Sequence, residues 1–497
     1  MQAQRKGSIR SRRRGFAAVL AMLFLVLFAV MSLGLYSAGT ISTQVSYNDA
    51  NNMKSLMAAE NGMQFIRYQL DKLDIPYTNP AQGAQALFNT IVTQLHTKLD
   101  NTANMKEGPV YTTYYNPTTG VDAGGNNVIY IPGRTGTPAA PVQHWMSLDA
   151  DTSFYITLTQ GDGHPVANTS LVVKVVGRFG NSTSTPNRAV QLVFNPAENA
   201  PDIFNYGVAT KSAVSMNGNV TITGITGHPE MGSVLSATGT THPLTMTGGP
   251  SISGNFAYTN AAGSNSFGNG TIAGESPSNS DFANHVLVLS KSPDFPVIDT
   301  TVFAQSVTTW NAPSGSVWTN VKIPPNYAGN INNVTINGIL YVMQPNNLTF
   351  RGTTNINGAI VVDNTNSGTY TTNSMSFSGS VVSKSMSTIT DSTVLAQLTT
   401  AEKGLSGAFL LAPNFSVGFS GNFGTVNGTI VSDKLTFSGN AGGTVQGTIV
   451  NLQDTAVSLA GTSDIIISSQ GTTNYPSGVY FGNHYTPSAT SYAEVHP

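Results

Sequence analysis

An uncharged apolar run near the amino terminus constrains this chain more than any other feature. No charged side chain occurs from Gly15 to Asn48, and the 20 residues from Phe16 to Leu35 are almost purely apolar. A helix of that length spans about 30 Å, the hydrocarbon thickness of a bilayer. The run therefore predicts a single transmembrane helix.

Basic residues precede this run and predict its orientation. The basic residues of this flank are Arg5, Lys6, Arg10, Arg12, Arg13 and Arg14. A basic flank stays cytoplasmic, so the amino terminus is expected inside the cell and the body outside the membrane. A cleaved secretory signal is the alternative, but its apolar core is shorter and ends at a small-x-small site. Bulky Tyr36 makes Tyr36-Ser37-Ala38 a poor site of that kind, so a retained anchor is favoured.

The helix is expected to continue beyond the membrane, over residues 16–76. Apolar residues recur there at alternating spacings of 3 and 4, which places them on one helical stripe. Pro76 ends the pattern. The stripe consists of Leu56, Ala59, Met63, Ile66, Leu70 and Leu73.

Two motifs in this segment resemble a known family. The string Arg12-Arg13-Arg14-Gly15-Phe16, followed by the apolar run, resembles the prepilin-peptidase site of type IV pilins and pseudopilins. Residues 55–62 resemble the Ala-Ala-Glu-x-Gly signature of the PilX-type minor pilin amino-terminal segment. The signature residues here are Ala58, Ala59, Glu60 and Gly62.

The resemblance covers residues 10–75 and carries several implications. It implies a pilus-assembly protein of the bacterial inner membrane, with its body periplasmic or extracellular in a filament. It implies that residues 1–15 are a leader, cleaved after Gly15, and that the new terminal residue, Phe16, is methylated. The implied partners are the prepilin peptidase, the inner membrane and other pilins, which contact the amino-terminal helix.

One position departs from the family pattern. Most major pilins carry Glu at the fifth mature position, where this chain has Leu20. A carboxylate at membrane depth is tolerated when it is paired, for example with a neighbouring subunit's terminal amine. K-type pseudopilins share the lack of Glu and are associated with priming or capping, so a minor subunit is expected. The alternative is an uncleaved single-span anchor in which Gly15 is incidental.

Residues 77–200 are expected to form a small α/β head. A short helical pattern runs over residues 84–99. Alternating apolar runs then predict antiparallel strands at residues 153–158, 171–176 and 189–194. A helix followed by such strands resembles a pilin head, and a generic β-sandwich is the alternative.

Residues 201–470 are repetitive and are expected to form a β-solenoid. One class of segments carries glycines such as Gly338, Gly358 and Gly428, and a second class ends in Phe-x-Gly. The period of 18–20 residues suits one coil per repeat, although Asn-Gly pairs also permit an antiparallel meander. An interior column is expected from Phe350, Phe377, Phe419 and Phe437. Residues 471–497 are expected to cap the last coil, so the fold class is α+β followed by all-β.

Composition argues against catalytic and nucleic-acid-binding roles. Only 46 of 497 residues are charged, and beyond residue 14 acidic residues outnumber basic ones by 24 to 16. Cysteine is absent, and the eight histidines show no zinc spacing. Some acidic residues could lie close together in the fold, and others could begin a calcium-binding loop. Both kinds are better explained as turn residues. These groups are Asp433 with Asp454, Asp149 with Asp151, and residues 363–366. No enzymatic activity, metal, cofactor or nucleic-acid partner is expected.

Two functions remain open on these grounds. The first is a structural minor pilin or pseudopilin that displays the solenoid from a filament. The second is a membrane-tethered adhesin whose solenoid binds surface glycans. A sugar-stacking patch could come from Tyr475, Tyr480, Phe481 and Tyr485, although a capping role for these residues is favoured.

The leader can be tested by mass spectrometry of the intact mature protein purified from its membrane. Cleavage after Gly15 predicts a chain that lacks residues 1–15 and begins at a methylated Phe16. A Gly15→Leu variant should retain Met1. A wild-type chain that also retains Met1 would remove the pilin interpretation.

Overall fold

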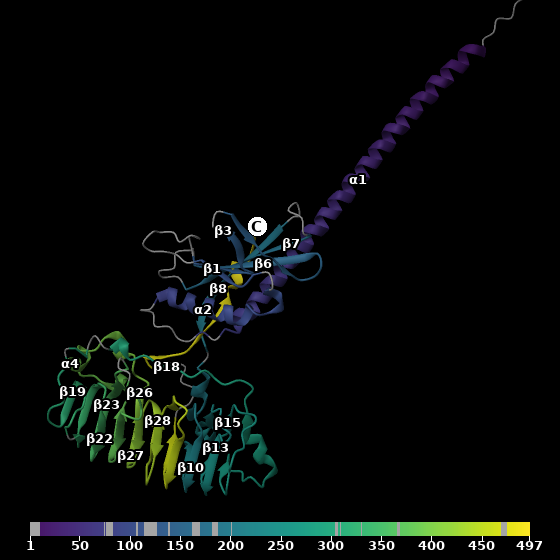
Figure 1. The fold of residues 1–497 in the computed structure, drawn as a ribbon. Coiled ribbons are helices and arrows are strands. Elements are labelled where there is room, and N and C mark those ends of the chain that lie inside the picture. The colour runs from purple at the N-terminus through teal and green to yellow at the C-terminus, as the bar shows by residue number, and fades with distance from the viewer. Residues whose placement is uncertain are drawn as a thin grey trace, which may run out of the picture. The chain divides into compact units, whose positions relative to one another are not determined.

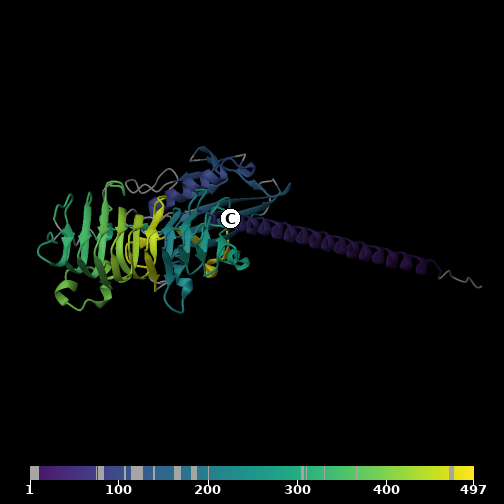
Figure 2. The same ribbon diagram turned by 90° about the horizontal axis from the view of Figure 1, so that it is seen from below.

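The structure is a computed structural model, and its described residues fall into two compact units (Figures 1 and 2). The first unit comprises Met1–Ala197 and His484–Pro497, and the second comprises Glu198–Asn483. The second unit is thus an insertion within the sequence of the first. The described residues are 10–73, 75, 83–105, 108–113, 127–137, 140–161, 169–180, 187–199, 201–303, 307–308, 310–329, 331–364, 368–468 and 475–497.

The first unit combines two helices with an antiparallel sheet. Helix α1 spans Arg10–Asp71 and α2 spans Gly83–Leu99. The sheet has the order β1-β2-β6-β7-β8, with β5 beside β6 and with β34 and β35 both beside β8. The strands are β1 (Tyr111–Thr113), β2 (Val128–Ile131), β5 (Met146–Ser147), β6 (Thr152–Gln160), β7 (Leu171–Phe179), β8 (Asn187–Glu198), β34 (Asn483–Pro487) and β35 (Ala493–Val495); β3 (Arg134–Thr137) and β4 (Ala140–Gln143) form a separate hairpin.

Helix α1 begins before the predicted span of residues 16–76 and ends within it. It ends at Asp71, and Leu73 remains buried just beyond it. Pro76, the predicted end of the pattern, lies outside the described residues. The predicted stripe is the face on which α1 packs, because Ala59, Met63 and Ile66 are buried in one cluster with β6 and β7.

The second unit is mostly β structure with extensive parallel pairing. Its first strands are β9 (Val208–Thr210), β10 (Val214–Gly218), β11 (Thr221–Gly224), β12 (Val234–Ser236), β13 (Leu244–Gly248), β14 (Ser251–Ile252), β15 (Phe256–Tyr258), β16 (Thr271–Ile272) and β17 (Val286–Val288). The next are β18 (Val297–Ile298), β19 (Val317–Ile323), β20 (Ile331–Asn332), β21 (Thr335–Val342), β22 (Asn347–Arg351), β23 (Thr353–Val362), β24 (Ser374–Phe377) and β25 (Ser380–Lys384). The last are β26 (Ala408–Phe419), β27 (Asn422–Asn427), β28 (Thr429–Phe437), β29 (Gly442–Gln446), β30 (Ile449–Asn451), β31 (Val457–Gly461), β32 (Asp464–Ile467) and β33 (Val479–Tyr480).

The repeat spacing seen in the sequence is the spacing between paired residues. Gly338 pairs with Gly358 between β21 and β23, and Phe419 pairs with Phe437 between β26 and β28. Both pairings are parallel, so these repeats do not form the antiparallel meander. The expectation of a long apolar helix followed by mostly β structure with large parallel sheets is confirmed.

The order of the strands differs from the order of the repeats. Val214 of β10 pairs in parallel with Leu244 of β13 on one side and with Val457 of β31 on the other. Strands β9 and β11 are likewise paired on both sides, with β30 and β32 as their late partners. Figure 1 shows β10 between β13 and β28. The chain therefore begins this row of strands in its interior.

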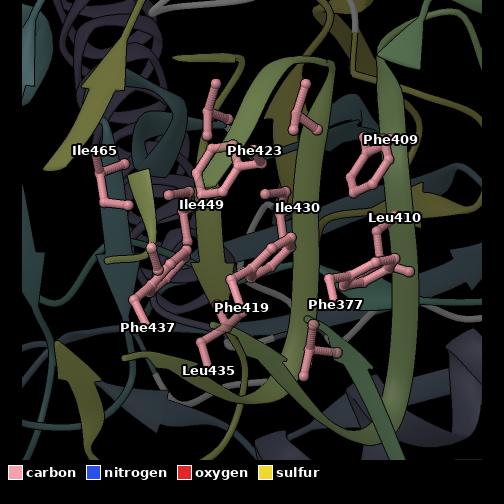
Figure 3. Packing of buried hydrophobic residues seen from close by; sticks show 14 of the residues in the cluster. Phe377, Phe409, Leu410, Phe419, Phe423, Ile430, Leu435, Phe437, Ile449 and Ile465 are labelled. Atoms are coloured by element: carbon pink, nitrogen blue, oxygen red, sulfur yellow. The ribbon is translucent and has the colours of Figure 1, made fainter. Parts of the chain in front are cut away.

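Aromatic side chains stack along the inside of the second unit. Ring centroids lie 4.8 Å apart for Phe350 and Phe377, 4.9 Å for Phe377 and Phe419, and 5.2 Å for Phe419 and Phe437. Figure 3 shows three of these rings in a row among buried Leu and Ile side chains. Burial of each ring contributes about 1.5–3 kcal/mol, so the column is a major part of this core.

The carboxy-terminal tail differs from its predicted role as a cap of the repeats. Strand β35 pairs antiparallel with β8, and Tyr485 is buried in the core of the first unit. Phe481, by contrast, is buried in the second unit against Phe204. The predicted tail is thus divided, because its last residues complete the antiparallel sheet.

Glycines at left-handed backbone positions provide a stability test. Gly461 has a φ of 82°, and a Cβ there would lie 2.4 Å from the carbonyl oxygen of Gly439. Gly227 has a φ of 88°, but a Cβ there meets nothing within 4 Å. Gly227→Ala should cost about 1–2 kcal/mol from backbone strain alone. Gly461→Ala should cost more, because steric overlap adds to strain.

The measurement is urea unfolding of the full chain in detergent, followed by tryptophan fluorescence. Trp310 and Trp318 belong to the second unit and report on it. Equal losses for the two variants would contradict the close approach of the strands at Gly461.

Candidate membrane and assembly helix

Helix α1 has two parts with opposite environments. Every residue from Phe16 to Ala50 is exposed, although residues 16–35 are apolar. From Asn51 onward one face of the same helix is buried. Figure 1 shows the amino-terminal part extending beyond the strands of its own unit. Among the described residues, this is the one helix long and apolar enough to cross a membrane.

The carboxy-terminal part of α1 approaches the sheet at backbone distance. A Cβ on Gly177 of β7 would lie 2.2 Å from the Ser55 carbonyl oxygen and 2.4 Å from the Ala59 nitrogen. A Cβ on Gly62 would lie 2.6 Å from side-chain carbons of both Phe154 and Val175. Helix and sheet therefore fit together only because these two positions lack a side chain.

The Ala-Ala-Glu-x-Gly signature has a packing explanation in this structure. Ala58 and Ala59 are 1% and 0% exposed, and both face the close approach at Gly177. Glu60 accepts a hydrogen bond from the Tyr492 hydroxyl. The small residues allow the helix to contact the sheet, and the carboxylate holds the tail beside the helix.

The tail is held by charges and a tyrosine as well as by strand pairing. Arg188 of β8 and Glu494 of β35 form an ion pair of 2.6 Å. The Tyr492 hydroxyl donates a hydrogen bond to Glu60, and this bond raises the pKa of Tyr492 to about 12. This pKa lies above the usual value near 10. The hydrogen bond from Tyr492 to Glu60 therefore stabilises the folded chain fully below pH 10, and this stabilisation is lost as the pH rises toward 12.

The predicted processing residues lie at the exposed end of α1. Gly15 and Phe16 fall within the helix, and Phe16 is 72% exposed. Leu20, at the position where major pilins carry Glu, is 46% exposed.

A cleft of about 350 Å³ lies beside α1 where its buried part begins. Met57 and Leu148 give it exposed apolar surface. Lys54 lies over the Phe179 ring, 4.1 Å from its centroid. Across the cleft, the hydrogen bond from the Thr152 side chain, then backbone N–H groups, lowers the pKa of Asp149. The cleft thus combines apolar surface with one cation and one anion.

Several acidic groups singled out in the sequence accept hydrogen bonds within the described part of the chain. Within the described part of the chain, no group of three His, Asp or Glu could hold a metal ion. Asp149 accepts hydrogen bonds from the backbone of its own turn, at Asp151 and Thr152. Burial raises the pKa of Asp433, whereas Asp454 accepts from Thr238. Asp363 accepts from Tyr341, and residues 365–366 lie outside the described residues.

The aromatic residues near the end of the chain do not make a sugar-stacking patch. Phe481 and Tyr485 are 0% and 3% exposed, in the cores of different units. Tyr475 is half-buried, and its ring lies 5.3 Å from the Phe481 ring. Tyr480 belongs to β33, which pairs with β18. Their role is internal packing.

The sequence analysis did not identify the residues of the sheet and the tail that contact α1. Gly177 is the only glycine of β7 and follows a mostly apolar stretch of that strand, which is a signal of close backbone approach. The Tyr492–Glu60 contact carries no local signal, because its partners are 432 positions apart in sequence.

Comparisons with known proteins add little to this geometry. No model of a known protein family matches the chain, and no curated protein matches it in sequence. The crystal structure of the competence-associated pilin ComZ from Thermus thermophilus aligns with 89% of this chain and 97% of its own. The identity is 11% and the TM-score is 0.24. At that score the alignment carries no argument, so function has to be argued from this chain's own packing.

The helix–sheet contact can be tested with two glycines of the same helix. Gly62→Ala should weaken packing by about 1–3 kcal/mol, because its methyl group overlaps Phe154 and Val175. Gly39→Ala is the control, since nothing lies within 4 Å of a Cβ there. Urea unfolding is followed by tryptophan fluorescence in a Trp310→Phe/Trp318→Phe background, where Trp145 is the remaining tryptophan, and measures both losses. A Gly62→Ala variant as stable as Gly39→Ala would contradict the packing.

Proposed function

We propose that this chain is a structural minor subunit of the type IV pilin and pseudopilin kind, anchored in the inner membrane by residues 16–35. It joins a pilus or secretion filament, within it or at its tip, through α1. The observation that supports this most directly is the two-part helix. Its apolar half has no cover from the described part of the chain, whereas its other half is packed on an antiparallel sheet.

The apolar half has two environments that can cover it. In lipid, a helix satisfies all its backbone groups internally and exposes apolar side chains without cost. In a filament, the same surface packs against equivalent helices. Ser37, Gly39 and Thr40 follow the apolar run and keep the next turns narrow enough for close helix packing.

Leu20 supports a minor rather than a major role. An apolar side chain at this position offers no carboxylate to a neighbouring subunit's amine. The subunit then gains from apolar contact alone, which suits a low-copy position at an end of the filament. Prepilin peptidase is the proposed processing enzyme, acting between Gly15 and Phe16.

The second unit is proposed to be a β-solenoid that the filament displays. Each repeat supplies strands to separate rows of parallel pairs, as β9, β10 and β11 do within residues 208–224. Equivalent strands of neighbouring repeats pair in parallel and in register. This pattern supports one coil per repeat.

The absence of cysteine allows a direct test of assembly through α1. A benzophenone probe on a single introduced cysteine at Ser42, an exposed position of α1, should cross-link to other filament subunits. The matched control is Ser420→Cys, exposed in the second unit, which should give no such product. Filaments sheared from cells and analysed by mass spectrometry identify the cross-linked chains.

The internal deletion of residues 199–482 completes the test. It keeps α1 and the antiparallel sheet, so the shortened chain should still sediment with sheared filaments. A full chain that stays in the membrane fraction, with the Ser42 probe cross-linked to no protein, would overturn the proposal.

A further inference from the structure

One face of the second unit carries a row of hydroxyl groups in register. The row crosses strands β22, β24, β26, β28, β31, β10 and β13, and each step is a parallel pairing. Gly418 of β26 interrupts it once. The hydroxyl-bearing members, in spatial order, are Thr349, Ser376, Thr436, Ser458, Ser215 and Thr245.

Neighbouring rows on the same face have a similar character. Two residues earlier on the strands, Asn347 pairs with Ser374 and Ser374 pairs with Ser416. Two residues later come exposed serines, including Ser378 and Ser420. The charged members of these rows on β22–β28 are Arg351 and Lys434. The face is therefore almost neutral and rich in donors and acceptors.

The face is presented rigidly. Outward residues such as Thr349, Ser376 and Thr436 are half-exposed, while the residues between them are buried. Parallel strands place successive hydroxyls about 4.8 Å apart along the row and rows about 6.6 Å apart along each strand. The aromatic column behind these strands holds the spacing in place.

We infer that this face binds a neutral polysaccharide, through hydrogen bonds to the hydroxyls of an ordered polymer surface. Three features favour this class of ligand. Repeated hydroxyl and amide groups match a ligand whose own hydroxyls repeat. The scarcity of charge gives no counterpart for a polyanion. The absence of aromatic residues from these rows favours contact along hydroxyl edges rather than ring stacking.

Ordered water is the competing ligand for a regular hydroxyl face. The rows mix Ser, Thr and Asn, contain Gly418 and end at Arg351, so they present donors and acceptors of several kinds. That mixture suits a polymer better than a uniform lattice. The inference develops the glycan-binding alternative and does not depend on filament assembly, so each can fail without the other.

The experiment measures retention of the detergent-solubilised full chain on insoluble cellulose, chitin and β-1,3-glucan particles. The test variant Ser376→Ala/Thr436→Val/Ser458→Ala removes three hydroxyls without adding charge. It should weaken retention on the bound polymer about tenfold, since each lost hydrogen bond reduces affinity severalfold.

A control of the same spacing exists on another face. Thr223, Thr444 and Thr425 lie on β11, β29 and β27, with Ile466 of β32 between the first two. Their triple substitution to Val should leave retention unchanged. A second test variant, Ser376→Lys/Thr436→Lys/Ser458→Lys, should abolish retention, and tryptophan fluorescence verifies that each variant is folded.

Three results would overturn the inference. The first is no retention on any of the three polymers. The second is an equal loss in the test and control variants. The third is inhibition of ice growth by the wild-type chain without retention on polysaccharide, which would assign the face to ordered water.

Discussion

In-register parallel pairing is the constraint on which the second unit depends. Paired residues of neighbouring repeats lie about 4.8 Å apart, so similar residues recur along many of the rows. Apolar positions then become columns, as with Phe377, Phe419 and Phe437. Amides become ladders, because the Asn357 side chain donates to the Asn337 side chain at 2.8 Å. Glycines align as well, as Gly218 does with Gly461.

The same constraint accounts for the unusual scarcity of charge. A Lys or Glu repeated in register would stand about 4.8 Å from identical charges on both sides, and like charges directly opposite destabilise a sheet. Residues 201–497 accordingly hold thirteen acidic and seven basic groups, well below an ordinary domain. Solubility has to come from neutral polar groups instead. The hydroxyl rows are thus a consequence of the fold before they are a surface available for binding.

Local pattern was sufficient to predict elements but not their neighbours. The span of α1, the strands β6, β7 and β8, and the repeat spacing all follow from periodicity, because each is decided within a few residues. The position of β10 does not, since its sequence is equally suited to pairing with the next repeat or with one 243 residues away. The contact of Glu60 with Tyr492 could not be predicted either, because its partners lie 432 positions apart in the sequence. Gly62 belongs to a motif visible in the sequence, whereas its contacts with Phe154 and Val175 depend on how the sheet packs against the helix.

The interior starting point of the strand row has a physical cause in the insertion itself. The second unit is inserted between β8 and β34, so the chain has to enter and leave it at nearby points. The Asn199 N–H donates to the Gly482 carbonyl oxygen at 2.8 Å, which shows how close those points are. A row built strictly in sequence order would separate its first and last strands by its whole length. Starting inside the row removes this conflict, because β9 then pairs directly with β30. The antiparallel sheet and α1 can therefore keep their packing whatever number of repeats the insertion contains.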